Sequence, residues 1–133
     1  MKIAIIGVDG LKLDDFEKKK AIQEIIKIIS SYEKPIIISG ACPKGGIDII
    51  AEMIADENGL EKMIFPPKTN DWDGYKERNM IISQECDVLY CITVPKKEKF
   101  CYHCKSDTHN VSGACWAKKY AETLGKETHV IVL

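Results

Sequence analysis

Four residues with the chemistry of metal ligands lie close together near the C-terminus. In the segment FCYHCKSDTHNVSGACW, two residues separate the first two ligands, four separate the next pair and five precede the last. Thiolates and an imidazole at such short spacings are typical of tetrahedral zinc sites. Because the protein fills all four positions, no metal-bound water remains to be activated, so the pattern predicts a structural Cys3His zinc site. The predicted ligands are Cys101, Cys104, His109 and Cys115.

Two alternatives to this ligand set stay open. His103 competes with His109, although its place between two cysteines would strain a chelate of such short reach. The thiols could also be reduced and buried, or joined as a disulfide. The lysines of this segment make it too polar for a core, which favours the metal: Lys96, Lys97, Lys99 and Lys105. The remaining cysteines are scattered and need no joint explanation: Cys42, Cys86 and Cys91.

A second candidate site is the glycine-rich segment SGACPKGGIDIIAE, which joins an expected strand to an expected helix. The unpaired N–H groups at a helix start attract anions, and glycines let the backbone approach a ligand closely. Lys44 adds a positive charge. Because the segment is neither a Walker loop nor a GxGxxG fingerprint, Gly40, Gly45 and Gly46 suit a plain tight turn equally well.

Polar side chains elsewhere could complete such an anion site. Arg78 offers a forked donor for phosphate, and Asn79 could read a ribose or base edge. Asp48 could accept from a ribose hydroxyl or pair with Arg78. The structural alternatives are a helix-terminal salt bridge for Arg78 and a first-turn carboxylate for Asp48. Trp72 could stack on a base or simply cover the edge of a core.

Alternating apolar runs and helical patterns indicate the elements that position these residues. Strands are expected near residues 2–6, 36–38, 62–65, 87–93 and 128–133, and the first helix over about 13–31. This alternation predicts an α/β Rossmann-like three-layer sandwich whose five-stranded parallel sheet has the order 3-2-1-4-5. Ligands of such sheets bind where the strand order reverses, so the loop from Gly7 to Gly10, which contains Asp9, the loop from Gly40 to Gly46 and the segment after Thr93 should meet there. A zinc-knuckle insertion, residues 95–116, should follow strand four and cover this crevice.

Composition bounds the class of protein. The 133 residues, 45% of them hydrophobic, fit a single domain spanning 1–133. The 19 basic and 20 acidic residues leave a net charge of −1, which gives no global attraction to nucleic acid or anionic membranes. No apolar run approaches the roughly 20 residues needed to span a bilayer, and no secretory signal is apparent, so a cytoplasmic location is expected. A homo-oligomer is compatible with the sequence.

Two stretches together carry a family resemblance. SGACPKGGIDIIAE resembles the serine-glycine and glycine-isoleucine-aspartate signature of the SLOG superfamily, and ERNMIISQECDVLYCI is similar to the arginine-asparagine motif of the same group. That superfamily includes DNA-processing protein A, the LOG-type phosphoribohydrolases and nucleotide-ligand sensors. The resemblance implies a Rossmann-like fold with a nucleotide or nucleic-acid pocket over the strand ends.

A third stretch, SGACWAKKYAETLGK, resembles the C-terminal helix of nucleoside 2-deoxyribosyltransferases. The nucleophilic glutamate of that pattern falls on Ala117, which cannot attack a glycosidic carbon. The glycine-glycine-threonine-glutamate signature of the LOG-type hydrolases is also absent. The likeness therefore favours binding over catalysis.

These observations give one preferred function and two alternatives. The preferred one is a zinc-containing module that holds a nucleotide or nucleotide derivative between the loops at Gly7, Gly40 and Arg78. The first alternative is an enzyme that cleaves or transfers an N-glycosidic or phosphate bond, with acid/base candidates Asp9, Asp48 and Glu77. The second is single-stranded nucleic-acid binding through the lysines at 96, 97 and 99 and the aromatic residues Phe100, Tyr102 and Trp116.

Overall fold

The computed structural model describes residues 1–97 and 99–133, and its centre is a five-stranded parallel sheet. The strand order is β3-β2-β1-β4-β7. The strands are β1 (Lys2–Gly7), β2 (Ile36–Ser39), β3 (Lys62–Ile64), β4 (Val88–Thr93) and β7 (Glu127–Val132). This confirms the predicted Rossmann-like order, with the fifth predicted strand labelled β7 because a separate hairpin precedes it.

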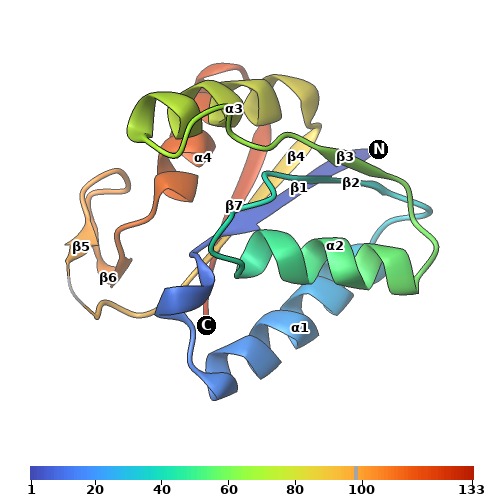
Figure 1. Ribbon diagram of the computed structural model, residues 1–133, viewed down its shortest axis with the longest axis horizontal. Helices are drawn as coiled ribbons and strands as arrows, with labels where there is room; N and C mark the ends of the chain where they lie inside the picture. Colours follow the sequence, from blue (N-terminus) through green and yellow to red (C-terminus); the bar gives the residue numbers. More distant parts are fainter. Residues whose placement is uncertain (98) are drawn as a thin grey trace.

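Helices cover both faces of the sheet (Figure 1). One layer holds α1 (Asp15–Ser30) and α2 (Ile47–Glu57), and the other holds α3 (Trp72–Glu85) and α4 (Gly113–Thr123). Successive side chains of β1 point to opposite layers, as the period of a strand requires. Ile3 and Ile5 pack in the core beneath α1 and α2, whereas Ala4 and Ile6 pack beneath α3 and α4. Both faces are therefore apolar, which explains the continuous apolar run of this central strand.

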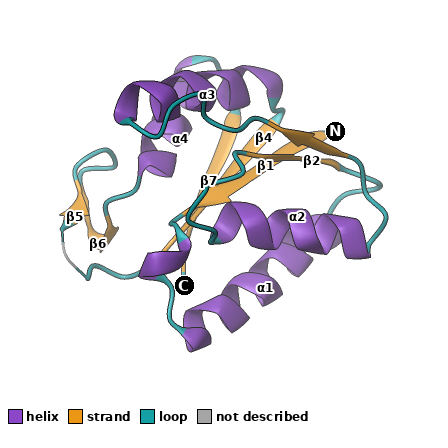
Figure 2. Ribbon diagram, in the orientation of Figure 1, coloured by secondary structure: helices purple, strands orange, loops and turns teal. Residues whose placement is uncertain are grey.

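The segment after β4 forms a small antiparallel hairpin, β5 (Phe100–Cys101) and β6 (Ser106–Asn110), apart from the main sheet (Figure 2). The backbone N–H of Asn110 donates to the carbonyl of Val94, which joins the hairpin base to the end of β4. This hairpin lies within the predicted insertion at 95–116, of which Glu98 is outside the described residues. Its strands were not predicted, because the segment lacks the apolar alternation that marks a strand.

No helix in the described part of the chain is long and apolar enough to cross a membrane.

Candidate ligand cavity and metal-binding cluster

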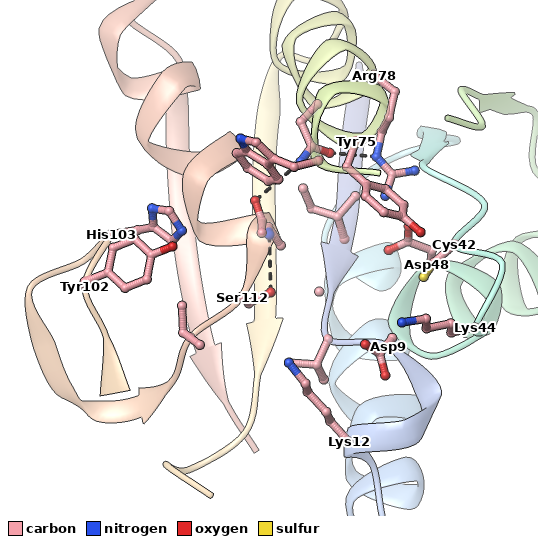
Figure 3. A pocket seen from close by; sticks show the side chains of 18 residues that line it. Asp9, Lys12, Cys42, Lys44, Asp48, Tyr75, Arg78, Tyr102, His103 and Ser112 are labelled. Atoms are coloured by element: carbon pink, nitrogen blue, oxygen red, sulfur yellow. Dashed lines mark hydrogen bonds between the residues drawn. The ribbon is translucent and has the colours of Figure 1, made fainter. Parts of the chain in front are cut away.

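A cavity of about 450 Å³ opens at the carboxyl ends of the central strands. Its floor is the end of β1 and the residues that follow it, and its walls come from the starts of α2 and α4, from α3 and from the hairpin (Figure 3). The strand order reverses between β1 and β4, so this is the crevice where open α/β sheets bind ligands. The predicted residues that line it are Gly7, Asp9, Lys44, Asp48, Arg78 and Asn79.

The three glycines of the predicted anion loop do not line the cavity; two of them shape it. Gly46 is the N-cap of α2 with φ 93°, and a Cβ there would lie 2.4 Å from the carbonyl oxygen of Val8. A Cβ on Gly40 would lie 2.4 Å from a guanidinium nitrogen of Arg78. Gly45 also has positive φ but faces open space. Gly46 and Gly40 therefore allow the backbone at Val8 and the guanidinium of Arg78 to approach the loop closely, although neither glycine lines the cavity.

Arg78 is held by two hydrogen bonds and one ring contact. Its Nε donates to Asn79 Oδ1 at 2.7 Å, and one terminal nitrogen donates to the carbonyl of Gly40. The ring of Tyr75 lies 5.4 Å from the guanidinium carbon. Within residues 1–97 and 99–133, no ion pair involves Arg78, so the predicted alternative of a helix-terminal salt bridge does not describe it. A guanidinium has five N–H donors, which leaves capacity for a ligand in the cavity.

The side chain of Asn79 forms its hydrogen bonds within the protein. Its side chain is 4% exposed, it accepts from Arg78, and its amide nitrogen lies 3.4 Å from the carbonyl of Gly113 as a donor. This contact joins α3 to the start of α4. Asn79 is therefore placed to orient Arg78, while its predicted contact with a ribose or base stays a prediction.

The two carboxyl groups of the cavity differ in environment. Asp48 is 3% exposed, and this burial raises its pKa to about 6. The Arg78 guanidinium and the backbone N–H groups of Gly7 and Cys42 lower the same pKa, but by less than burial raises it. Asp9 is more exposed and caps a short 3-10 helix, η1 (Gly10–Lys12), by accepting from the N–H of Leu11 at 2.9 Å. The pKa of Asp48 is therefore raised toward the range that acid/base chemistry uses.

Several residues that line the cavity were not predicted from the sequence. Lys12 extends toward the same space as Lys44 (Figure 3), and the start of α4 contributes Ser112 and Gly113. The Ser112 hydroxyl accepts from the N–H of Ala114 at 3.2 Å as the N-cap. One signal was present: the tetrapeptide SGAC occurs twice, at residues 39–42 and 112–115, and each copy leads from a strand or hairpin toward a helix. No comparable signal marked Lys12.

The four predicted metal ligands lie together, on the hairpin and in the first turn of α4. The ligand atoms of Cys101, Cys104, His109 and Cys115 all lie within 4.8 Å of one another. A tetrahedral zinc ion with bonds of about 2.0–2.3 Å places its ligand atoms about 3.3–3.8 Å apart. Cys115 Sγ and His109 Nε2 are 3.8 Å apart. These residues are therefore close enough to hold a metal ion, and the choice of His109 over His103 agrees with the cluster, since His103 lines the cavity instead.

Contacts within the cluster orient its imidazole, and two of its three thiols are buried. His109 Nδ1 lies 3.1 Å from Thr108 Oγ1, which leaves Nε2 directed at the thiols. Burial, together with the neighbouring Cys115 and Cys101 thiols, raises the pKa of Cys104 to about 12. All six cysteines are free thiols, so the disulfide alternative is not what the structure shows. Cys91, which the sequence analysis left unexplained, lies behind the cluster with its Sγ 3.5 Å from that of Cys115.

The lysines before the hairpin are engaged in contacts. The Lys97 ammonium pairs with Glu17, whose side chain is buried on α1, and donates to the carbonyl of Lys12 at 2.9 Å. The Lys96 and Lys99 ammonium groups lie 6.0 Å and 5.0 Å from the ring centres of Phe100 and Tyr102. Lys97 therefore tethers the hairpin to the first helical layer.

The fold and these sites define a class: an α/β Rossmann-like protein with a cavity at the strand ends and a Cys3His cluster that could hold a metal ion beside it. Comparisons of this chain with protein-family models, with curated proteins and with solved structures find no match.

Proposed function

We propose that this protein binds a nucleotide or nucleotide derivative in the cavity and carries a structural zinc ion at the Cys3His cluster. The observation that carries the first part is the convergence of Arg78, Lys12 and Lys44 with two carboxyl groups in one cavity at the strand ends. Cationic side chains and helix N-termini bind phosphate groups, and carboxylates accept hydrogen bonds from ribose hydroxyls. The resemblance of its glycine-rich loop and arginine-asparagine motif to the SLOG superfamily supports the same assignment.

The phosphate group is the most specific part of this proposal. Titration calorimetry should show that AMP, GMP, CMP or UMP binds, whereas the corresponding nucleosides bind at least about tenfold more weakly, because they lack the charge that the cavity's cations recognise. Native mass spectrometry of the freshly purified protein would show a ligand that it already carries. Nucleosides that bind as tightly as their monophosphates would contradict the phosphate assignment.

Zinc is the metal that the ligand set favours. Three thiolates and one imidazole form a soft, four-coordinate site, whereas magnesium and calcium prefer oxygen ligands. Elemental analysis should give one zinc per chain, and anomalous scattering should place it among these four side chains with sulfur at about 2.3 Å. Cys104→Ser should remove the metal. Cys86→Ser, which alters a buried thiol that is not part of the cluster, should keep it. Full zinc content in the Cys104 variant would contradict the proposed ligand set.

An enzyme acting on N-glycosidic bonds is the second candidate, because one observation favours it. Asp48 is a buried carboxyl in the cavity whose pKa is about 6, as a general acid or base requires. Glu77 does not line the cavity; it pairs with Lys68 at 3.1 Å on the surface. Ala117, at the position of the transferase nucleophile, is buried and has no reactive group. Release of free base from nucleoside monophosphates that is lost in Asp48→Asn would favour this second function over simple binding.

A further inference from the structure

The turn of the metal-binding hairpin carries two aromatic side chains that belong to the cavity. Tyr102 and His103 occupy the two positions between Cys101 and Cys104, and both line the cavity. Their ring centres are 4.2 Å apart. Figure 3 shows them across the cavity from Arg78. In this segment of four residues, the two outer residues belong to the metal-binding cluster and the two inner residues line the cavity.

The hairpin has little apolar packing of its own. β5 is two residues long, and its pairing with β6 is irregular between Phe100 and Cys101. Among the side chains described for residues 99–108, only that of Cys101 is buried, and Cys101 is a proposed ligand. Ordering a chain segment costs conformational entropy, which here must be offset by the cluster, because so little apolar surface is available to offset it. Backbone hydrogen bonds and the Lys97–Glu17 ion pair fix the base of the hairpin, so a metal bound at the cluster would be the main interaction that holds its turn in place.

The cluster joins the turn to a firmly packed helix. Cys115 lies in the first turn of α4, and α4 packs on the sheet through the buried residues Ala117 and Ala121. The hydroxyl of Ser83 on α3 donates to the carbonyl of Ala117 at 2.9 Å, which adds a polar contact between the two helices. Loss of the metal would release the turn and leave α4 in position. Tyr102 and His103 would then move relative to the other walls of the cavity.

We infer that the metal ion promotes nucleotide binding by holding Tyr102 and His103 as the wall that contacts the base. This inference rests on the proposed nucleotide function. Aromatic side chains stack on the faces of bases with little regard to base identity, and each such contact contributes a measurable part of the affinity. The cations Lys12, Lys44 and Arg78 belong to other elements, so the phosphate end of the cavity does not depend on the metal.

The two binding events are linked through the turn. Once the metal has ordered the turn, a nucleotide that stacks on it no longer bears that ordering cost, so metal and nucleotide each strengthen the binding of the other. Thermodynamic reciprocity requires the two effects to be the same factor.

AMP and ribose 5-phosphate are the probes, because they share the phosphate and the sugar and differ in the base. Calorimetry compares zinc-loaded wild type, Cys104→Ser, Tyr102→Ala and Tyr102→Phe, with Cys86→Ser as the control for loss of a buried thiol. The AMP affinity should fall about tenfold in Cys104→Ser and in Tyr102→Ala, and by clearly less in Tyr102→Phe, which keeps a ring for stacking. The ribose 5-phosphate affinity should change less than about twofold in every variant. In wild type, saturating AMP should raise the zinc affinity, measured against a chromophoric chelator, by the same factor of about ten, and in Tyr102→Ala it should not.

Each outcome decides between the two proposals. Unchanged AMP affinity in the zinc-free Cys104 variant overturns the inference and leaves nucleotide binding standing. An equal loss for AMP and ribose 5-phosphate also overturns it, because the hairpin would then act on the whole cavity and not on the base. Tyr102→Ala keeps all four ligands, so its result stands even if the Cys104 variant does not fold. Failure of both probes to bind the loaded wild type overturns the inference together with the nucleotide function.

Discussion

The buried carboxyl of Asp48 should make the stability of this protein depend on pH in an unusual direction. Burial raises the pKa of Asp48 to about 6 from its ordinary 3.8. Between these values the folded protein keeps a proton that the unfolded chain has already released. The free energy of unfolding therefore falls as pH rises through this window, and the part contributed by Asp48 is fully present only below it.

The magnitude follows from the size of the pKa change. One pKa unit corresponds to about 1.4 kcal/mol, so a rise of about two units corresponds to about 3 kcal/mol. Replacing Asp48 by Asn removes this titration and keeps the shape of the side chain. Because the unfolded carboxyl is already partly ionised at pH 4, the difference in unfolding free energy, Asp48→Asn minus wild type, should grow by about 2 kcal/mol between pH 4 and pH 7.

Urea denaturation of wild type and Asp48→Asn at several pH values measures this difference. Asp71 supplies the control, because it is exposed and its side chain accepts hydrogen bonds from Thr69 and from the N–H of Gly74, which lower its pKa. Its contribution has the opposite sign: it is present above the ordinary carboxyl pKa and is lost as pH falls. A constant difference between wild type and Asp48→Asn across pH 4–7 would refute the assignment of a raised pKa to Asp48.

Three further predictions concern the cavity and the hairpin. Arg78→Ala should weaken binding of a nucleoside monophosphate by about 1.5–3 kcal/mol in calorimetry, with Arg78→Lys intermediate because a lysine lacks the forked donor; equal affinities would remove Arg78 from the site. Gly46→Ala should destabilise the fold by at least about 2 kcal/mol in urea denaturation, because its Cβ would meet backbone atoms, whereas Gly45→Ala, which faces open space, should cost about 1 kcal/mol. If the lysines at 96, 97 and 99 bind single-stranded nucleic acid, a mobility-shift titration should show an affinity that falls steeply with salt and disappears when all three become Ala; salt-independent binding would exclude that role.

The sheet could be predicted because its signals are local. The apolar run from Lys2 to Ile6 ends at a glycine, and each later run follows a helical stripe, so the alternation indicates both the class of fold and the strand order. The Cys3His cluster was equally accessible, because its four ligands lie within 15 residues and metal geometry restricts their spacing. Local patterns of this kind need no knowledge of distant contacts.

The lining of the cavity could be predicted only in part, because it depends on contacts between distant elements. Lys12 and Tyr75 come from separate segments, and nothing in their own neighbourhoods shows that they converge. The glycines were recognised as a loop signal, but their role is to permit close approach of Val8 and Arg78 to the loop, which requires the packed structure. Asn79 shows the same limit: its partner Gly113 is 34 residues away.

The position of the insertion in the chain explains why a metal centre and a ligand cavity share a wall. The connection from β4 to β7 leaves the sheet beside the point where the strand order reverses, so any segment inserted there must border the crevice. A short polar segment cannot order itself by burying apolar side chains, and four ligands can replace that missing core. On the proposed function, the residues between the first two ligands are then free to vary without loss of the metal, whereas changes to the ligands affect the metal and the cavity together. Exchanging Tyr102 and His103 for aliphatic residues should therefore lower nucleotide affinity at constant zinc content, and a loss of zinc in such variants, measured by elemental analysis, would contradict this separation of roles.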